Sequence, residues 1–247
     1  MRILVTNDDG IGSVGLRTVA KVLGKQHEVY VIAPVAQRSA AGHGISVHSP
    51  LAYEELEPED GCRMRIAVDG MPADCVKLAV LHFMKDRLPD LVVSGINEGS
   101  NVGSDVIYSG TVSAALEGAY MGVRSIAVSN SDRTFLEGYA LAAELVAGSL
   151  DEIMSFDMPD YTALNINYPG VRHRGIAVVP VGRNRYTDSF HEVRKGVLQI
   201  GGEPQDEETD TETDVSSVRR GFVTISPVTL DMNDYALLGK LREGFTL

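Results

Sequence analysis

The chain has 247 residues, of which 44% are hydrophobic and 23% are charged, and its formal net charge is −12. These values are typical of a soluble globular protein and argue against a duplex nucleic-acid groove, which relies on a basic surface. No apolar stretch approaches the roughly 18 residues of a membrane span, and the start of the chain lacks the layout of a signal peptide. Two cysteines form neither a metal-site spacing nor a disulfide framework. We therefore expect a cytoplasmic protein that binds neither membranes nor duplex nucleic acid.

The first predicted strand ends in two adjacent carboxylates. Residues 3–5 form an apolar run without alternation, which is typical of a strand buried on both faces of a parallel sheet. The loop that follows, residues 7–12, contains Asp8 and Asp9. Ligands bind just beyond the carboxyl ends of such strands. Because the two carboxylates repel each other there, the pair favours a divalent cation with oxygen ligands.

Two other interpretations of this loop stay open. Asp-Asp-Gly is ordinary turn chemistry, in which Asp caps backbone amides and Gly supplies a positive φ. Gly10, Gly12 and Gly15 also match the G-x-G-x-x-G pattern of dinucleotide-binding proteins. That second interpretation is disfavoured, because the aspartates would face a pyrophosphate and the next strand ends in Ala33-Pro34 instead of an acid. An NAD-linked oxidoreductase therefore remains the weaker alternative.

Helices and strands alternate up to about residue 160. The residue spacing predicts helices over 16–23, 73–84, 112–121 and 135–153, and strands over 27–34, 91–94 and 125–128. Two extended segments, 45–54 and 63–68, are joined by an acidic loop and favour a hairpin-like excursion. This rhythm predicts a Rossmann-like, doubly wound α/β fold with a mostly parallel sheet.

Beyond residue 160 the pattern changes to strands without intervening helices, which are predicted over 163–167, 176–181, 186–193 and 222–227. A run from 203 to 214 carries seven acids and no Lys or Arg, which is typical of a solvated loop. A short helix is expected near 235–241. Because such a meander cannot easily enlarge a parallel sheet, we expect residues 161–247 to form a β-rich oligomerisation arm and residues 1–160 to form the catalytic core.

Polar oxygens follow three of the predicted strands. Asp8 and Asp9 follow the first, Ser39 lies in the loop after the second, and Asn97 follows the strand over 91–94. Because the carboxyl ends of parallel strands meet at one edge, these four side chains are expected to converge. Two carboxylates and two neutral oxygens suit Mg²⁺, Mn²⁺ or Ca²⁺ better than zinc. The sequence therefore predicts one divalent metal ion per subunit, Mg²⁺ or Mn²⁺ before Ca²⁺.

A candidate phosphate cradle lies at a loop-to-helix junction. Ser109, Gly110 and Thr111 precede the predicted helix 112–121, where free amides and the positive helix end favour an anion. The same residues also fit a routine N-cap. A phosphate beside a metal ion favours phosphoester hydrolysis, in which the ion polarises the phosphoryl oxygens and activates a water. Asn97 is expected to contact the phosphate as well as the metal ion.

The attacking group and the proton donor are indicated less directly. Phosphatases with an aspartyl nucleophile use an Asp-x-Asp pattern, but Asn7 occupies its first position when the pattern ends at Asp9. Because an amide cannot be that nucleophile, attack by water is preferred. His43 lies in the Ser39 loop and could protonate the leaving oxygen or orient the phosphate. A lone loop histidine is also a common surface residue.

These motifs resemble those of the SurE family of survival-protein nucleotidases. The resemblance spans nearly the whole chain and rests on the segments 7–11, 37–42, 94–118 and 211–227. It implies a divalent metal held by the four residues Asp8, Asp9, Ser39 and Asn97, and hydrolysis of nucleoside 5′- and 3′-monophosphates. It also implies homodimers or homotetramers in which C-terminal arms are exchanged. Ala40 and His43 depart from the residues that are usual in the family's second loop.

The preferred hypothesis is a metal-dependent nucleoside monophosphate phosphatase, and its rivals are a non-catalytic regulatory nucleotide-binding protein and the NAD-linked oxidoreductase. The sequence alone does not distinguish base preference, 5′ from 3′ preference, action on polyphosphate, the physiological metal, or dimer from tetramer.

Overall fold

The computed structural model describes residues 1–59, 61–205 and 212–244. Its centre is a nine-stranded sheet in the order β3-β4-β2-β1-β5-β6-β7-β13-β8. These strands are β1 (Arg2–Thr6), β2 (Glu28–Pro34), β3 (Ala52–Leu56), β4 (Met64–Asp69), β5 (Leu91–Glu98), β6 (Arg124–Asn130), β7 (Thr162–Tyr168), β8 (Ile176–Val178) and β13 (Val223–Thr229). The strands from β4 to β7 pair in parallel. The predicted α/β class with a mostly parallel sheet is confirmed.

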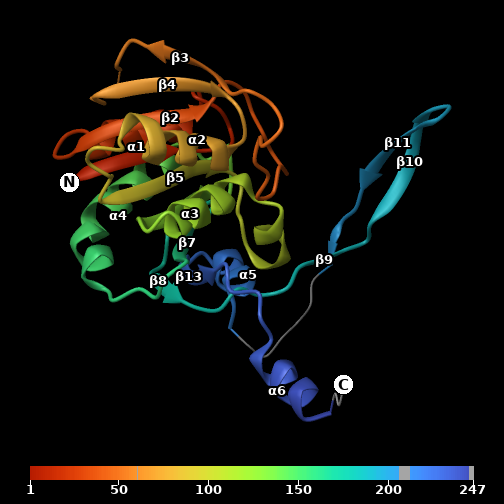
Figure 1. Cartoon of the computed structure of the whole chain (residues 1–247). Coiled ribbons are helices and arrows are strands. Elements are labelled where there is room, and N and C mark those ends of the chain that lie inside the picture. Colours follow the sequence, from red (N-terminus) through yellow and green to blue (C-terminus); the bar gives the residue numbers. More distant parts are fainter. Residues whose placement is uncertain (60, 206–211, 245–247) are drawn as a thin grey trace.

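Helices cover both faces of this sheet (Figure 1). The helices of the described residues are α1 (Val14–Leu23), α2 (Pro72–Leu78), α3 (Gly110–Tyr120), α4 (Leu136–Ser155), α5 (Asp214–Arg219) and α6 (Tyr235–Gly244), with a π-helical turn η1 (Ala79–Phe83) and a 3₁₀ turn η2 (Gly103–Ile107). Of these, α6 lies apart from the sheet (Figure 1). Ile3 and Val5 pack with α1 and α4, whereas Leu4 packs with α2 and α3. The apolar run in β1 lacks alternation because both of its faces are buried.

The segment before β4 forms the antiparallel excursion that the sequence indicated. β3 pairs antiparallel with β4, with Ala52 opposite Asp69. The strand is shorter than the predicted range 45–54, since only Ala52–Leu56 is in the sheet. It therefore forms one edge of the sheet, away from the central strand β1.

The placement of the C-terminal strands corrects a prediction. Strands beyond residue 160 were expected to lie outside the parallel sheet, but β7 pairs in parallel with β6, β13 pairs antiparallel with β7, and β8 pairs in parallel with β13. The long helix α4 supplies the crossover that parallel pairing of β7 requires. The sheet then continues beyond β7 with β13, which runs in the opposite direction, and with β8 at the edge.

Only part of the C-terminal segment projects from the sheet. The arm consists of β9 (Arg185–Tyr186), β10 (Ser189–Arg194), β11 (Val197–Gly201) and β12 (Pro204–Gln205). Figure 1 shows the β10–β11 hairpin far from the sheet and α6 extending separately toward the C-terminus. Every residue of β10 is exposed. In the acidic run 203–214, residues 206–211 lie outside the described residues.

Within the described ranges, no helix combines the length and the apolar character needed to cross a bilayer.

Candidate functional site

Three loops are joined by backbone hydrogen bonds at the carboxyl edge of the sheet. The amide of Arg38, in the loop after β2, donates to the carbonyl oxygen of Asp8 at 2.7 Å. Further along the same loop, the amide of Gly42 donates to the carbonyl oxygen of Tyr108 at 3.1 Å. The loop that carries Ser39 is thus bonded both to the loop after β1 and to the loop after β5.

Asp8 is buried against the first turn of α3. The hydroxyl of Thr111 donates to Oδ1 of Asp8 at 2.5 Å. A Cβ atom at Gly110 would lie only 2.8 Å from Cβ of Asp8 and 2.9 Å from its Oδ2, so this close approach requires glycine. Burial raises the pKa of Asp8, while hydrogen bonds from the Thr111 hydroxyl and from the amides of Gly110 and Thr111 oppose the shift. The positive end of α3 therefore faces a carboxylate.

Asp9 is half-buried beside Asp8. Its Oδ2 accepts a hydrogen bond from the amide of Glu98 at 3.0 Å, and its Oδ1 accepts one from Nε2 of Gln37 at 3.5 Å. Burial, followed by the charge of Asp8, raises the pKa of Asp9 to about 7. The protein's own hydrogen bonds thus leave the negative charge of the pair incompletely compensated. A divalent cation would stabilise both ionised carboxylates, so the pair fits such an ion.

The neighbouring chain segments carry two side chains with neutral oxygens, Asn97 and Ser39. Nδ2 of Asn97 donates to the carbonyl oxygen of Gly99 at 2.8 Å, which leaves Oδ1 as the amide atom suited to a cation. Ser39 is exposed and directly follows Arg38. Among the described residues, no group of three or more His, Cys, Asp or Glu side chains could hold a metal ion. A cation held by Asp8 and Asp9 would therefore rely on neutral oxygens, a combination that suits Mg²⁺, Mn²⁺ or Ca²⁺.

The start of α3 is capped as the alternative interpretation of the 109–111 segment expects. The hydroxyl oxygen of Ser109 accepts a hydrogen bond from the amide of Val112 at 3.0 Å, so the N-cap is confirmed. The hydroxyl of Thr111 is engaged by Asp8. The two side-chain oxygens therefore have protein partners, and phosphate binding by Ser109, Gly110 and Thr111 stays a prediction.

Asn7 braces the aspartate loop and was not identified as a site residue from the sequence. Its Nδ2 donates to Oγ of Ser13 at 2.8 Å and to the carbonyl oxygen of Gly10 at 3.1 Å. Its Oδ1 accepts from the amide of Gly10 at 3.2 Å. The fully buried side chain thus fixes the turn that presents Asp8 and Asp9. An asparagine three residues before a glycine in a turn was the available signal.

Asn101 is the centre of a buried network that holds the loop after β5. Its backbone N–H donates to Oδ1 of Asn167 at 2.8 Å. Its backbone carbonyl oxygen accepts from Nδ2 of Asn165 at 2.7 Å and from Nδ2 of Asn167 at 3.1 Å. Its own Nδ2 donates to Oγ of Ser129 at 2.9 Å. Side chains of β6 and β7 therefore position the chain between Asn97 and α3. Two alternating asparagines in an otherwise apolar strand were the signal in the sequence.

His43 contacts Glu117 of α3, farther along that helix than the turn that faces Asp8. Its Nε2 lies 2.8 Å from Oε2 of Glu117, and Nζ of Lys77 lies 2.7 Å from Oε1 of the same buried carboxylate. Although burial acts in the opposite direction, hydrogen bonds from His43 and Lys77 lower the pKa of Glu117. Glu117 follows Gly110 by two helical turns, about 10 Å along the axis. His43 thus ties the second loop to α3, and its role as proton donor stays a prediction.

The structure gives the third glycine of the G-x-G-x-x-G pattern a packing role. A Cβ atom at Gly15 would lie 1.8 Å from the carbonyl oxygen of Ile96, so α1 and β5 are in direct backbone contact there. This glycine serves helix–strand packing, a role that the third glycine also has in dinucleotide-binding proteins, so the argument against that interpretation remains the aspartate pair.

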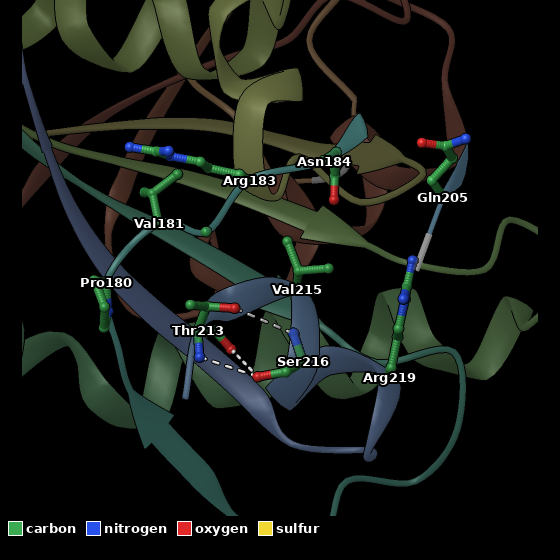
Figure 2. A pocket seen from close by; sticks show the side chains of 10 residues that line it. Pro180, Val181, Arg183, Asn184, Gln205, Thr213, Val215, Ser216 and Arg219 are labelled. Carbon is green, nitrogen blue, oxygen red and sulfur yellow. Dashed lines mark hydrogen bonds between the residues drawn. The ribbon is translucent and has the colours of Figure 1, made fainter. Parts of the chain in front are cut away.

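A separate cleft lies beside the base of the arm (Figure 2). It has a volume of about 360 Å³ and is lined by the 180–184 segment, by Gln205 and by the start of α5. Nearby, Nδ2 of Asn184 donates to the carbonyl oxygen of Val102 at 2.9 Å, and the hydroxyl of Tyr186 donates to Oδ2 of Asp105 at 2.6 Å. The base of the arm is therefore attached to the loop that leads to α3.

Comparisons with known proteins agree with this architecture. The family model described as Survival protein SurE matches residues 3–188. The 5'-nucleotidase SurE of Pelotomaculum thermopropionicum is 42% identical over 248 residues, covering 98% of this chain and 95% of the relative. The 5'-nucleotidase SurE of Kosmotoga olearia is 41% identical over 251 residues, covering 98% of both.

A solved structure extends the likeness to three dimensions. The SurE protein from Aquifex aeolicus superposes with a TM-score of 0.84 at 31% sequence identity, covering 98% of this chain and 99% of that one. The likeness includes the sheet and the C-terminal segment, because nearly the whole of each chain is covered. With a family match over most of the sequence and a shared fold, the chain belongs to the SurE family.

Proposed function

We propose that the chain is a metal-dependent phosphomonoester hydrolase that releases phosphate from nucleoside 5′-monophosphates. The observation that carries the proposal is the Asp8–Asp9 pair at the carboxyl edge of the sheet, directly against the positive end of α3. Relatives about 40% identical over nearly the full length bear the name 5'-nucleotidase SurE, which supports the same substrate class.

The residues that would hold the metal ion are Asp8 and Asp9 through carboxylate oxygens, and Asn97 and Ser39 through neutral oxygens. An ion at this edge would supply positive charge for the phosphoryl oxygens and would make the attacking water more acidic. The Asn7 brace and the Thr111 hydroxyl keep the two carboxylates in place. These contacts support a rigid ligand set that requires little rearrangement when the ion binds.

The phosphate would lie between the metal ligands and the first turn of α3. Amides of Gly110 and Thr111, together with the helix dipole, favour negative charge at this position. Departure of the nucleoside oxygen requires a proton. Nε2 of His43 is engaged by Glu117, so this atom could donate the proton only after the ring leaves Glu117. Water is therefore the simpler donor.

The proposal extends to nucleoside 3′-monophosphates and to the ends of polyphosphate chains, since each presents a terminal phosphoryl group to the same ligands. We also propose a homodimer or homotetramer built through the arm. Its exposed hairpin carries Phe190, Leu198 and Ile200, apolar side chains that a partner subunit could cover. The two cysteines are free and buried, as expected in the reducing cytoplasm.

The test is phosphate release from a panel of nucleoside 5′- and 3′-monophosphates and polyphosphate with Mg²⁺ or Mn²⁺, repeated with a chelator. Asp8→Asn is expected to lower the rate at least about 100-fold, because it removes a charged ligand. Asp157→Asn is the matched control, since this carboxylate is exposed and remote in the chain. Full activity of the Asp8 variant, or activity that persists in chelator, would disprove metal dependence.

Two rival functions predict different results, which require binding measurements beside the assay of phosphate release. A regulatory nucleotide-binding protein would bind nucleotide saturably without releasing phosphate under any metal. An NAD-linked oxidoreductase would bind dinucleotide in the presence of chelator.

A further inference from the structure

A basic cleft lies at the opposite edge of the sheet from Asp8 and Asp9. Its volume is about 350 Å³. The polar side chains that line it belong to Lys25, Gln26, His27, Glu28, Arg63 and Arg87. They come from the α1–β2 turn, from the residue before β4 and from the segment after η1. Because β2 runs for seven residues between the two edges, the cleft is roughly 20 Å from the aspartate pair.

The charge of this cleft is opposite to that of the whole chain. Lys25, Arg63 and Arg87 are exposed, and the part of the chain that the structure describes provides none of the three with an ion-pair partner. The single acid of the lining, Glu28, lies 4.0 Å from Nε of Arg2. In a chain with a net charge of −12, three cations around one hollow form a local positive field.

Neutral donors accompany the cations. Nδ1 of His27 is buried and has no hydrogen-bond partner among the described residues, so no such bond fixes the ring through this atom. Burial lowers the pKa of His27, which favours the neutral ring with one N–H group. The amide of Gln26 is exposed beside it. The cleft thus combines two guanidinium groups, an ammonium group, an imidazole and an amide, all of which can donate to oxygen.

We propose that this cleft binds an oxyanion of the phosphate type, with Arg63 and Arg87 as its principal donors. Planar guanidinium groups present paired N–H donors that match phosphate oxygens, and Lys25 adds a point charge. The ligand could be free inorganic phosphate or the terminal phosphate of a nucleotide, which share this chemistry. The inference goes beyond the proposed function, because the cleft is at the edge of the sheet that does not carry the metal ligands.

The experiment measures binding of inorganic phosphate, and in parallel of a nucleoside monophosphate, to the full chain by equilibrium dialysis in chelator. Without a cation, Asp8 and Asp9 repel phosphate, so binding there is suppressed. The double variant Arg63→Ala/Arg87→Ala is compared with Arg133→Ala/Arg242→Ala, whose arginines are exposed elsewhere. Arg63→Lys/Arg87→Lys keeps the charge and removes the forked donors.

The proposal expects saturable binding of one equivalent of phosphate or nucleotide to the parent and the control. It also expects at least tenfold weaker binding to the alanine variant and an intermediate affinity for the lysine variant. Binding of nucleotide alone would identify the nucleotide as the source of the phosphate group. If neither phosphate nor nucleotide bound at millimolar concentration, or if all four proteins bound with equal affinity, the proposal would be overturned. Phosphate release with metal is assayed separately. Failure of the proposed function would abolish phosphate release without changing the binding of phosphate in chelator.

Discussion

Replacing Gly110 with alanine tests the contact between α3 and the aspartate pair. The new methyl group would lie 2.8 Å from Cβ of Asp8, 2.9 Å from its Oδ2 and 3.1 Å from Cγ of Pro72. Ordinary carbon contacts are about 3.5–4.0 Å, so either the Asp8 side chain or the helix must move by roughly 0.7 Å. Alanine would otherwise favour a helix more than glycine does, and the clash therefore acts against the intrinsic preference.

The expected cost follows from that overlap. Overpacking of this kind destabilises by about 1–3 kcal/mol, and a misplacement near 1 Å costs on the order of 100-fold in rate. Gly110→Ala should therefore lose about 100-fold in metal-dependent phosphate release and bind the metal ion more weakly. Phosphate release, metal titration by calorimetry and urea unfolding measure the three effects.

Gly148→Ala provides the matched control for Gly110→Ala. This glycine lies within α4, and nothing is within 4 Å of an added Cβ. Alanine there should stabilise the protein by up to about 1 kcal/mol and leave phosphate release unchanged. If the Gly110 variant kept the activity and metal affinity of the parent, the close approach of α3 to Asp8 would have no functional importance.

Three further variants examine the neighbouring contacts. Asn167→Ala leaves the buried backbone N–H of Asn101 without its partner and removes one of the two hydrogen bonds to the Asn101 carbonyl oxygen, so it should lower the free energy of unfolding by about 2–3 kcal/mol in urea. The pKa of Asp9 is raised from 3.8 to about 7, so in chelator the folded protein should lose stability as the pH rises through this range. Asp9→Asn should abolish that loss between pH 4 and pH 8. Glu117→Gln removes the charge that holds His43 and Lys77, and should weaken metal affinity by up to about tenfold through the second loop.

Controls for these variants come from similar residues with fewer contacts. Asn165→Ala removes one hydrogen bond to the Asn101 carbonyl and should cost less than Asn167→Ala. Asp157→Asn should not alter the pH dependence, and Glu144→Gln should not alter metal affinity, because both carboxylates are exposed. An equal effect of a variant and its control would contradict the role given to that contact.

The sequence predicted those structural features whose physical cause lies within a few neighbouring residues. Residues 3–5 were predicted as a buried strand because every position is apolar, and each face of β1 packs on a different pair of helices. Ser109 fitted an N-cap because its hydroxyl reaches the amide three residues later. The fold class followed from the order of such segments.

Contacts between distant segments could not be predicted in the same way. His43 and Glu117 are separated by 74 residues, and Asn101 and Asn167 by 66. Neither pair has a spacing that singles it out before the fold is known. The addition of β13 to the sheet also depends on its direction, which the apolar pattern of the strand does not encode. The sequence therefore indicated candidate ligands, whose role stays a prediction, but it did not indicate the residues that hold them in place.

The buried Asn101 network has a consequence for motion in a catalytic cycle. It joins the loop after β5 to β6 and β7, so this loop should move together with the sheet and resist hydrogen exchange. The loop with Ser39 is attached through backbone bonds at Arg38 and Gly42 and through its side-chain contacts, and much of it is exposed to solvent. Entry of substrate and departure of product should therefore proceed by displacement of the Ser39 loop, while the opposite wall remains still.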